Sequence, residues 1–213
     1  MGRRPVLEVR ELWAGDPTAP ACRGVDLALW PGSVTAVLGG PGAGKSQLLR
    51  CMGLDFAPLS GHILLHGVDI TGLAPDRRRR LRTEAIELVH PPAPADEPDR
   101  TIPATRGGVV LAATRPTVPI AGMRQRIQIA KALTRRSDAL LLDEPLIGLD
   151  EAVRTRILEL VDRLRTNAHT AILVATRHEE VAVELADHVV VLEHGTVAGR
   201  GHPDDLLGGR RSA

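Results

Sequence analysis

The fold of this chain is decided by eight consecutive residues, Gly39-Gly40-Pro41-Gly42-Ala43-Gly44-Lys45-Ser46. They match the pattern G-x-x-x-x-G-K-[ST], and they lie between an apolar segment, 33–38, and a segment of helix-forming composition, 47–52. Glycines let the backbone curl until successive N–H groups point inward, and the following helix adds its positive N-terminal dipole. The stretch therefore predicts a phosphate-binding loop between a strand and a helix.

Two side chains of this loop carry the chemistry that the pattern predicts. Lys45 can reach the β- and γ-phosphates of a nucleotide, and the Ser46 hydroxyl can ligate Mg²⁺. Gln47, the next residue, is assigned with the loop to nucleotide binding. The predicted cofactors are therefore ATP, held by residues 39–47, and Mg²⁺, held in part by Ser46.

A second candidate site follows the apolar run 140–142, which ends in Asp143 and Glu144. A carboxylate at the end of a buried strand is costly unless something pairs with it. Mg²⁺ bound to the nucleotide would supply that pairing, so Asp143 is predicted to bind nucleotide and metal. Glu144 is placed to polarise the water that attacks the γ-phosphate and is predicted, with Lys45, to be catalytic.

Composition limits the class of protein. The chain has 213 residues, of which 43% are hydrophobic and 1% aromatic, so one packed domain with an aliphatic core is expected. A formal net charge of +1 argues against a dedicated nucleic-acid binder, and no nucleic-acid partner is expected. The arginines at 77–80, with Arg82, are interpreted as a solvated helix face, with binding of nucleic acid or lipid headgroups as the alternative.

Membrane and redox signals point to the cytosol. No apolar run approaches the roughly 18 residues that span a bilayer, and the first residues lack the apolar stretch of a signal peptide. Cys22 and Cys51 have neither CxxC nor zinc spacing, which favours two free thiols in a reducing compartment. We therefore expect a soluble chain that reaches a membrane only through a partner.

Strand and helix signals alternate along much of the chain. The apolar positions 153, 157, 160, 161 and 164 predict an amphipathic helix, and 181–186 a second one. Proline-rich composition from 91 to 119 predicts a loop-rich insert. The predicted strands are 25–29, 33–38, 63–65, 68–70, 139–142, 171–176 and 189–192. Such alternation implies an α/β fold with a mainly parallel sheet.

Several segments resemble the ATP-binding cassette (ABC) ATPases. Asp143-Glu144-Pro145, followed by Gly148-Leu149-Asp150, is similar to their Walker B and D-loop run. Other similar segments follow the family order: Ser60-Gly61, Gly67-Val68-Asp69-Ile70, 124–133, Leu185-Ala186-Asp187 and His194-Gly195. The resemblance covers nearly the whole chain and is to the nucleotide-binding subunit of an ABC transporter.

The resemblance implies a single ABC-type domain over residues 1–213. It would comprise a P-loop NTPase (RecA-like) core at 33–59 and 124–200 and a small antiparallel β part at 1–35 and 60–72. A shortened helical and signature insert would occupy 91–123. Family members also imply partners: a second ABC ATPase subunit, in a homo- or heterodimer that sandwiches ATP, and a separate membrane permease. The expected location is therefore cytoplasmic, peripheral on the inner face of the cell membrane.

Several family positions are altered in this chain. The register of Arg124-Gln125-Arg126 puts 119–123 on the signature motif, with Ile120 in place of the serine that contacts the γ-phosphate across the dimer. Arg177 stands at the switch-histidine position, with His178 one residue later as the alternative, and both are catalytic candidates. No glutamine occurs at 89–91, where the family carries one. Trp13 is the candidate for stacking on adenine, with an ordinary packed tryptophan as the alternative.

The function predicted from these features is ATP hydrolysis that powers transport. The alternatives are a nucleotide-gated scaffold with little turnover and the degenerate half of an asymmetric heterodimer. Glu144 favours hydrolysis, whereas Ile120, Arg177 and the missing glutamine favour the alternatives. A cassette ATPase of chromosome maintenance or DNA repair is disfavoured, because the chain has no room for a long coiled coil and its charge is near neutral. A small-molecule kinase is disfavoured by the Asp143-Glu144-Pro145 context.

Overall fold

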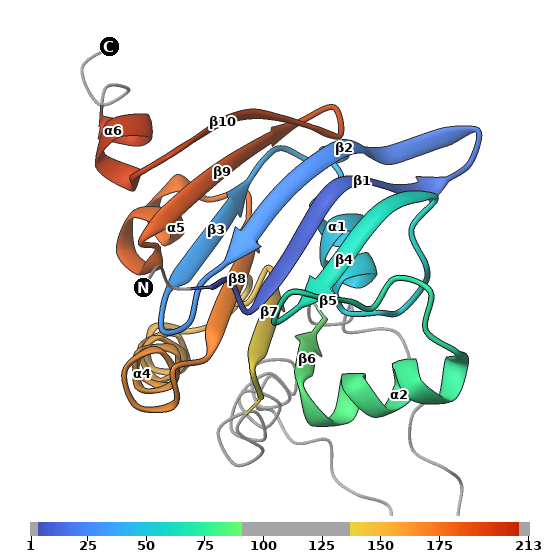
Figure 1. Cartoon of the computed structure of the whole chain (residues 1–213). Helices are drawn as coiled ribbons and strands as arrows, with labels where there is room; N and C mark the ends of the chain where they lie inside the picture. Colours follow the sequence, from blue (N-terminus) through green and yellow to red (C-terminus); the bar gives the residue numbers. More distant parts are fainter. Residues whose placement is uncertain (1–3, 91–136, 209–213) are drawn as a thin grey trace, which may run out of the picture.

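Two sheets and the helices packed on them form the chain in the computed structural model, which describes residues 4–90 and 137–208. The larger sheet has six strands in the order β10-β9-β3-β8-β7-β6, and the smaller has four in the order β2-β1-β4-β5 (Figure 1). The predicted α/β class, with a mainly parallel sheet and a small antiparallel one, is confirmed. The insert predicted at 91–123 lies outside the described residues.

The elements have the following bounds. The six-stranded sheet consists of β3 (Val34–Leu38), β6 (Ile86–Val89), β7 (Ala139–Asp143), β8 (Ala171–Thr176), β9 (His188–Glu193) and β10 (Thr196–Gly201). The four-stranded sheet consists of β1 (Leu7–Asp16), β2 (Ala19–Leu29), β4 (Ser60–Leu65) and β5 (Val68–Asp69). The described helices are α1 (Lys45–Met52), α2 (Pro75–Glu84), α4 (Glu151–Ala168), α5 (Glu179–Leu185) and α6 (Pro203–Leu207).

Parallel pairing brings the ends of three strands to one edge of the larger sheet. β3 pairs in parallel with β8, with Leu38 opposite Thr176, and β8 pairs in parallel with β7, with Ala175 opposite Asp143. Only β10, at the edge, runs antiparallel to its neighbour β9. The loops that leave β3, β7 and β8 therefore start side by side, at the carboxyl edge where α/β sheets bind ligands.

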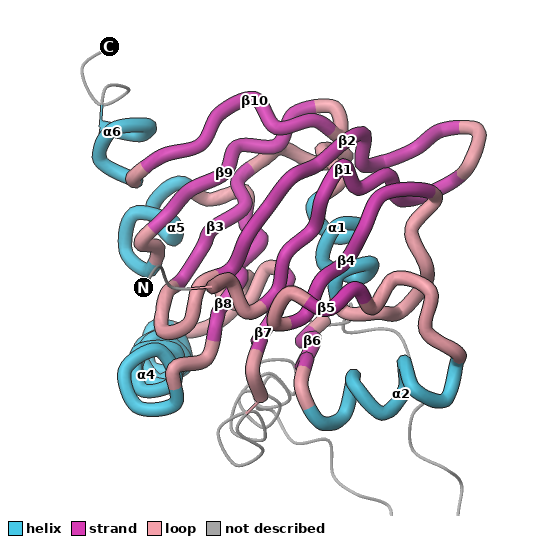
Figure 2. The backbone as a smooth tube through the Cα atoms, viewed as in Figure 1, coloured by secondary structure: helices cyan, strands magenta, loops and turns pink. Residues whose placement is uncertain are grey.

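Alternate residues of the central strand β7 enter two different cores. Leu141 of β7 packs in a core shared with α1 and the antiparallel sheet, whereas Leu140 and Leu142 pack in a core shared with α4 and α5. The strand side chains alternate between faces, so both faces of this sheet must be covered by apolar surface. As Figure 2 shows, the antiparallel sheet forms a separate layer from the larger sheet, and α1 contacts both.

The arginine-rich segment forms α2, no residue of which is buried. This agrees with the predicted solvated helix face. The strand after it, β6, lies at the edge of the larger sheet and was missed by the sequence analysis, because its four residues sit between this charged helix and a proline pair. Its parallel pairing with β7 adds Ile86 and Val89 to the two cores.

Both cysteines are free and buried, as the spacing predicted for free thiols. Burial raises the pKa of the Cys22 thiol, and of the Cys51 thiol, to about 12. Both thiols therefore stay protonated near neutral pH and pack as small apolar groups. Among the described residues, none of the helices is long and apolar enough to cross a membrane.

The loop between β3 and α1 is packed against strand β2 at Gly44. This residue has a φ of +101° and precedes α1, and a Cβ placed on it would lie 2.2 Å from the carbonyl oxygen of Ala21. The Cys22 thiol donates to the Gly44 carbonyl at 3.5 Å. Both the left-handed backbone and the missing space require glycine here. Gly40, in the same loop, has nothing within 4 Å of such a Cβ.

We predict that Gly44→Ala lowers the free energy of unfolding by more than about 2 kcal/mol, because the side chain would meet backbone and strain φ at once. The matched control, Gly40→Ala, should change it by no more than about 0.5 kcal/mol. Urea unfolding followed by circular dichroism measures both. Equal effects of the two substitutions would contradict the packing of this loop against β2.

Candidate active site

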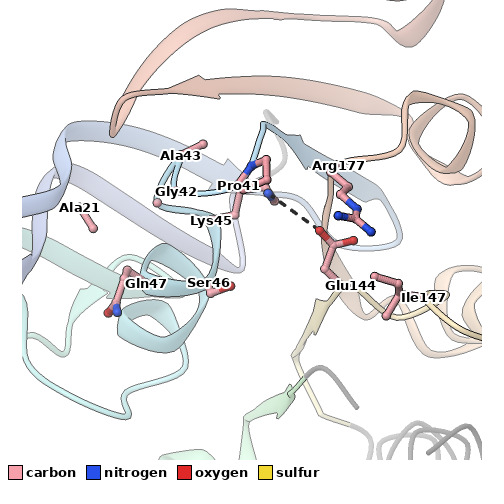
Figure 3. A pocket seen from close by; sticks show the side chains of 11 residues that line it. Ala21, Pro41, Gly42, Ala43, Lys45, Ser46, Gln47, Glu144, Ile147 and Arg177 are labelled. Carbon is pink, nitrogen blue, oxygen red and sulfur yellow. Dashed lines mark ion pairs between the residues drawn. The ribbon is translucent and has the colours of Figure 1, made fainter. Parts of the chain in front are cut away.

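A pocket of about 430 Å³ opens between the loop after β3 and the ends of β7 and β8. In Figure 3 the side chain of Lys45 points from the loop toward Glu144, beside which Arg177 lies, whereas Ser46 and Gln47 lie on the side of the loop away from Arg177. The residues that line it are Ala21, Pro41, Gly42, Ala43, Gly44, Lys45, Ser46, Gln47, Glu144, Ile147 and Arg177. The two sequence segments predicted to form the site therefore face one cavity.

Lys45 lies at the centre of this arrangement with 8% of its surface exposed. Its Nζ donates to the carbonyl oxygens of Gly39 at 2.6 Å and Gly40 at 3.2 Å, and it lies 3.9 Å from Oε1 of Glu144. A buried ammonium needs such partners, because an unpaired charge is strongly disfavoured away from water. The two glycines contribute to the site through these carbonyls; neither lines the pocket.

Glu144 is directed into the pocket by an unusual backbone conformation. Its φ is +46°, which few residues other than glycine adopt, and its N–H donates to the carbonyl of Ala175 at 2.9 Å. Its Oε2 accepts a hydrogen bond from the Thr176 hydroxyl at 3.3 Å. Strained backbone of this kind persists only where the surroundings hold it in place, and it concentrates at functional sites. Thr176 was missed by the sequence analysis, since a polar residue ending a strand carries no specific signal.

Asp143, the last residue of β7, is 2% exposed, and its Oδ1 accepts no hydrogen bond from any residue that the structure describes. Burial raises the pKa of Asp143, while the Ser46 hydroxyl and the Lys45 ammonium counter this shift. A buried carboxylate oxygen without a partner is costly. Asp143 and the Ser46 hydroxyl offer the oxygen ligands that Mg²⁺ prefers, so these residues fit the predicted metal.

Arg177 and His178 follow β8 directly, and the structure places them differently. Arg177 lines the pocket, whereas His178 does not. The His178 ring instead lies between Arg177 and Glu180: Arg177 Nε is 3.3 Å from its Nε2, and its Nδ1 is 3.1 Å from Glu180 Oε1. Of the two switch-position candidates, only Arg177 therefore faces the site directly.

Of the two remaining predicted residues that the structure describes, one lines the pocket and the other does not. Gln47, from the first turn of α1, lines the pocket, and Trp13 does not. Trp13 lies on β1, 39% exposed, and its carbonyl accepts from the Leu59 N–H at 2.7 Å. Ala21 and Ile147 line the pocket and were missed, because small and aliphatic residues carry no sequence signal for binding. The signature segment, 119–123, lies outside the described residues.

Comparison with known proteins places this site in a family. The model of the ABC transporter family matches residues 22–100. The chain is 34% identical over 221 residues to the lipoprotein-releasing system ATP-binding protein LolD of Novosphingobium aromaticivorans, an alignment that covers 91% of this chain and 98% of that protein. It is 31% identical to the putrescine transport ATP-binding protein PotG of Escherichia coli, over 95% of this chain but 58% of PotG.

A solved structure gives the same result. The chain aligns with cbiO1 from Clostridium perfringens, part of the ABC transporter complex cbiONQ, with a TM-score of 0.76 and 25% identity, covering 97% of this chain and 92% of that one. The similarity to LolD spans almost all of both proteins, which a shared phosphate loop alone would not produce. This chain therefore belongs to the ABC transporter family, as one of its ATP-binding ATPase cassettes.

Proposed function

We propose that this cassette hydrolyses MgATP in the pocket at Lys45 and closes on it as a dimer, thereby driving transport through a separate membrane permease. One observation carries the proposal: the Lys45 ammonium and the Glu144 carboxylate lie 3.9 Å apart in a pocket that Arg177 also lines. A cation, a base and a second cation thus share one cavity. The cassette would act at the inner face of the cell membrane, held there by the permease.

ATP would bind with its phosphates in the loop after β3. The N–H groups of this loop and of the first turn of α1 are suited to phosphate oxygens, and the helix dipole adds a favourable field. Phosphate oxygens are stronger acceptors for the Lys45 ammonium than the carbonyls of Gly39 and Gly40, because both partners are then charged. Arg177 reaches the pocket from the opposite side and could bind the terminal phosphate.

Asp143 and Ser46 would hold Mg²⁺ beside the nucleotide. The Oδ1 of Asp143, which has no hydrogen-bond partner among the described residues, and the hydroxyl of Ser46 are oxygen ligands suited to this. When bound, the ion neutralises part of the phosphate charge. The raised pKa of Asp143 reflects its burial, which a nearby cation would offset.

In the hydrolytic step, the Glu144 carboxylate accepts a proton from water while the water oxygen forms a bond to the γ-phosphorus. The bond between that phosphorus and the bridging oxygen breaks, and the oxygen leaves with ADP. Lys45 and Arg177 balance the negative charge on the phosphate oxygens. Thr176, by donating to Oε2, holds the carboxylate in the orientation in which Oε1 faces Lys45. Removal of one positioned donor to the transition-state charge, such as Lys45 or Arg177, costs about 10²–10³ in rate.

A second candidate function is a nucleotide-gated scaffold, or the degenerate half of a heterodimer. It is favoured by the sequence at 119–123, where the side chain of Ile120 has no donor for the phosphate of a nucleotide held by the partner subunit. The geometry around Glu144 favours hydrolysis. The two candidates differ in turnover and agree in ATP binding, so a direct comparison of the two properties separates them.

Glu144→Gln should lower steady-state ATP hydrolysis by at least about 100-fold while ATP binding is retained, because the amide cannot accept the proton. Phosphate release and fluorescent-nucleotide binding measure the two properties. Glu193→Gln, which removes an exposed carboxylate at the end of β9, is the matched control and should leave both unchanged. Binding without turnover in the wild-type chain would overturn hydrolysis by this cassette alone and support the scaffold.

Ile120→Ser should raise turnover of the wild-type chain about tenfold or more, since it restores one donor at the signature position of a dimer. This increase in turnover should be absent in a Glu144→Gln background, because that variant lacks the general base that hydrolysis requires. Unchanged turnover in Ile120→Ser would contradict the view that position 120 limits hydrolysis.

A further inference from the structure

The turn after β8 connects two side chains of the pocket to residues that do not line it. Arg177 donates through Nε to Nε2 of His178 at 3.3 Å, and Nδ1 of His178 lies 3.1 Å from Oε1 of Glu180. The backbone N–H of His178 donates to the Thr176 hydroxyl at 3.1 Å, and that hydroxyl donates to Glu144 at 3.3 Å. His178 is therefore linked by hydrogen bonds to two side chains of the pocket. Its ring bonds directly to Arg177, and its backbone N–H is connected to Glu144 through the Thr176 hydroxyl.

The chemistry of arginine determines which ring nitrogen of His178 accepts a hydrogen bond. A guanidinium has five N–H donors and no acceptor, so Nε2 of His178 must be the acceptor of the bond from Arg177. A neutral imidazole that accepts at Nε2 carries its proton on Nδ1, which is the atom that faces the Glu180 carboxylate. These two contacts fit the tautomer with the proton on Nδ1, in which Nδ1–H donates to the Glu180 carboxylate.

This bond leaves the functional end of Arg177 available. The bond to His178 uses only Nε, so it leaves the two terminal amino groups, which form the fork that binds phosphate, to a ligand in the pocket that Arg177 lines. An unrestrained arginine on an exposed turn would lose much side-chain freedom on binding a ligand. An anchor at Nε removes part of that loss beforehand.

We propose that His178 is a positioning residue that holds the Arg177 fork toward the terminal phosphate of ATP, with Glu180 fixing the tautomer in which it can do so. This inference rests on the proposed function, because it assigns a terminal phosphate to the pocket. His178 does not line the pocket and so acts through Arg177. The His178 side chain is 40% exposed and the Glu180 side chain is 70% exposed, so the contact between them is a modest one.

The first test compares affinities for ATP and ADP in a Glu144→Gln background, where ATP is not consumed. Arg177→Ala should weaken ATP binding and leave ADP binding unchanged, because ADP has no terminal phosphate to contact. His178→Leu should reproduce about a 3- to 10-fold part of that ATP-specific loss, the range expected of one hydrogen bond. His178→Gln, whose amide oxygen can accept the bond from Nε, should restore it.

A double-mutant cycle separates positioning from a general structural effect. Adding His178→Leu to Arg177→Ala should cause no further loss of ATP affinity if His178 acts through Arg177. An additive loss, or an equal loss of ATP and ADP affinity in His178→Leu, would overturn the proposal. Thermal unfolding of each variant shows whether the chain is still folded. A loss of ATP affinity in His178→Leu that is also seen in His178→Gln would contradict the proposal as well.

A second measurement is independent of nucleotide. Proton and ¹⁵N NMR of the chain labelled at histidine, with His178 assigned from the His178→Gln spectrum, reports which ring nitrogen carries the proton. The proposal requires Nδ1–H, and a shift away from it in Glu180→Gln is expected. An Nε2–H tautomer in the wild-type chain would overturn the proposal even if the cassette hydrolyses ATP. Absence of turnover, with Nδ1–H and the ATP-specific losses present, would overturn only hydrolysis.

Discussion

The parallel register of β3, β7 and β8 is the constraint on which the site depends. It aligns Leu38 with Thr176, and Ala175 with Asp143, so that the loops after all three strands leave the sheet at one edge. The first loop brings Lys45, the second Glu144 and the third Arg177. A slip of one residue in any pairing would turn each side chain of that strand to the opposite face and separate these groups. Apolar cores on both faces of the sheet hold the register.

The consecutive carboxylates Asp143 and Glu144 show how one strand end serves two purposes. Asp143 is the last residue of the strand, nearly fully buried, with an oxygen that has no partner among the described residues. Glu144 leaves the strand with a positive φ and turns toward Lys45. Two adjacent residues thus reach different parts of the same site, one suited to a metal and one to a reacting water. The strain at Glu144 is offset by its bonds to Ala175 and Thr176.

Much of this arrangement could be predicted from local sequence, because a phosphate loop and an apolar run ending in Asp-Glu each specify their own geometry. The sequence left open which side chains point into the pocket, because tertiary structure determines this. Arg177 and His178 are neighbours, and only the end of β8 decides which of them points into the pocket. Ala21 enters the site through close packing of its carbonyl against Gly44. Neither contact leaves a pattern in the sequence. Trp13 was assigned to the nucleotide by proximity in the chain, and it does not line the pocket.

In the proposed mechanism, Lys45 and Arg177 bind the terminal phosphate from two sides, with Glu144 beside it. The most direct measurement is a crystal structure of the Glu144→Gln chain with ATP and Mg²⁺. We expect Nζ of Lys45 and the terminal nitrogens of Arg177 to lie within hydrogen-bond distance of γ-phosphate oxygens, with Nε of Arg177 still bonded to His178. A nucleotide bound in this pocket with Arg177 turned into solvent, or a γ-phosphate away from residue 144, would contradict it.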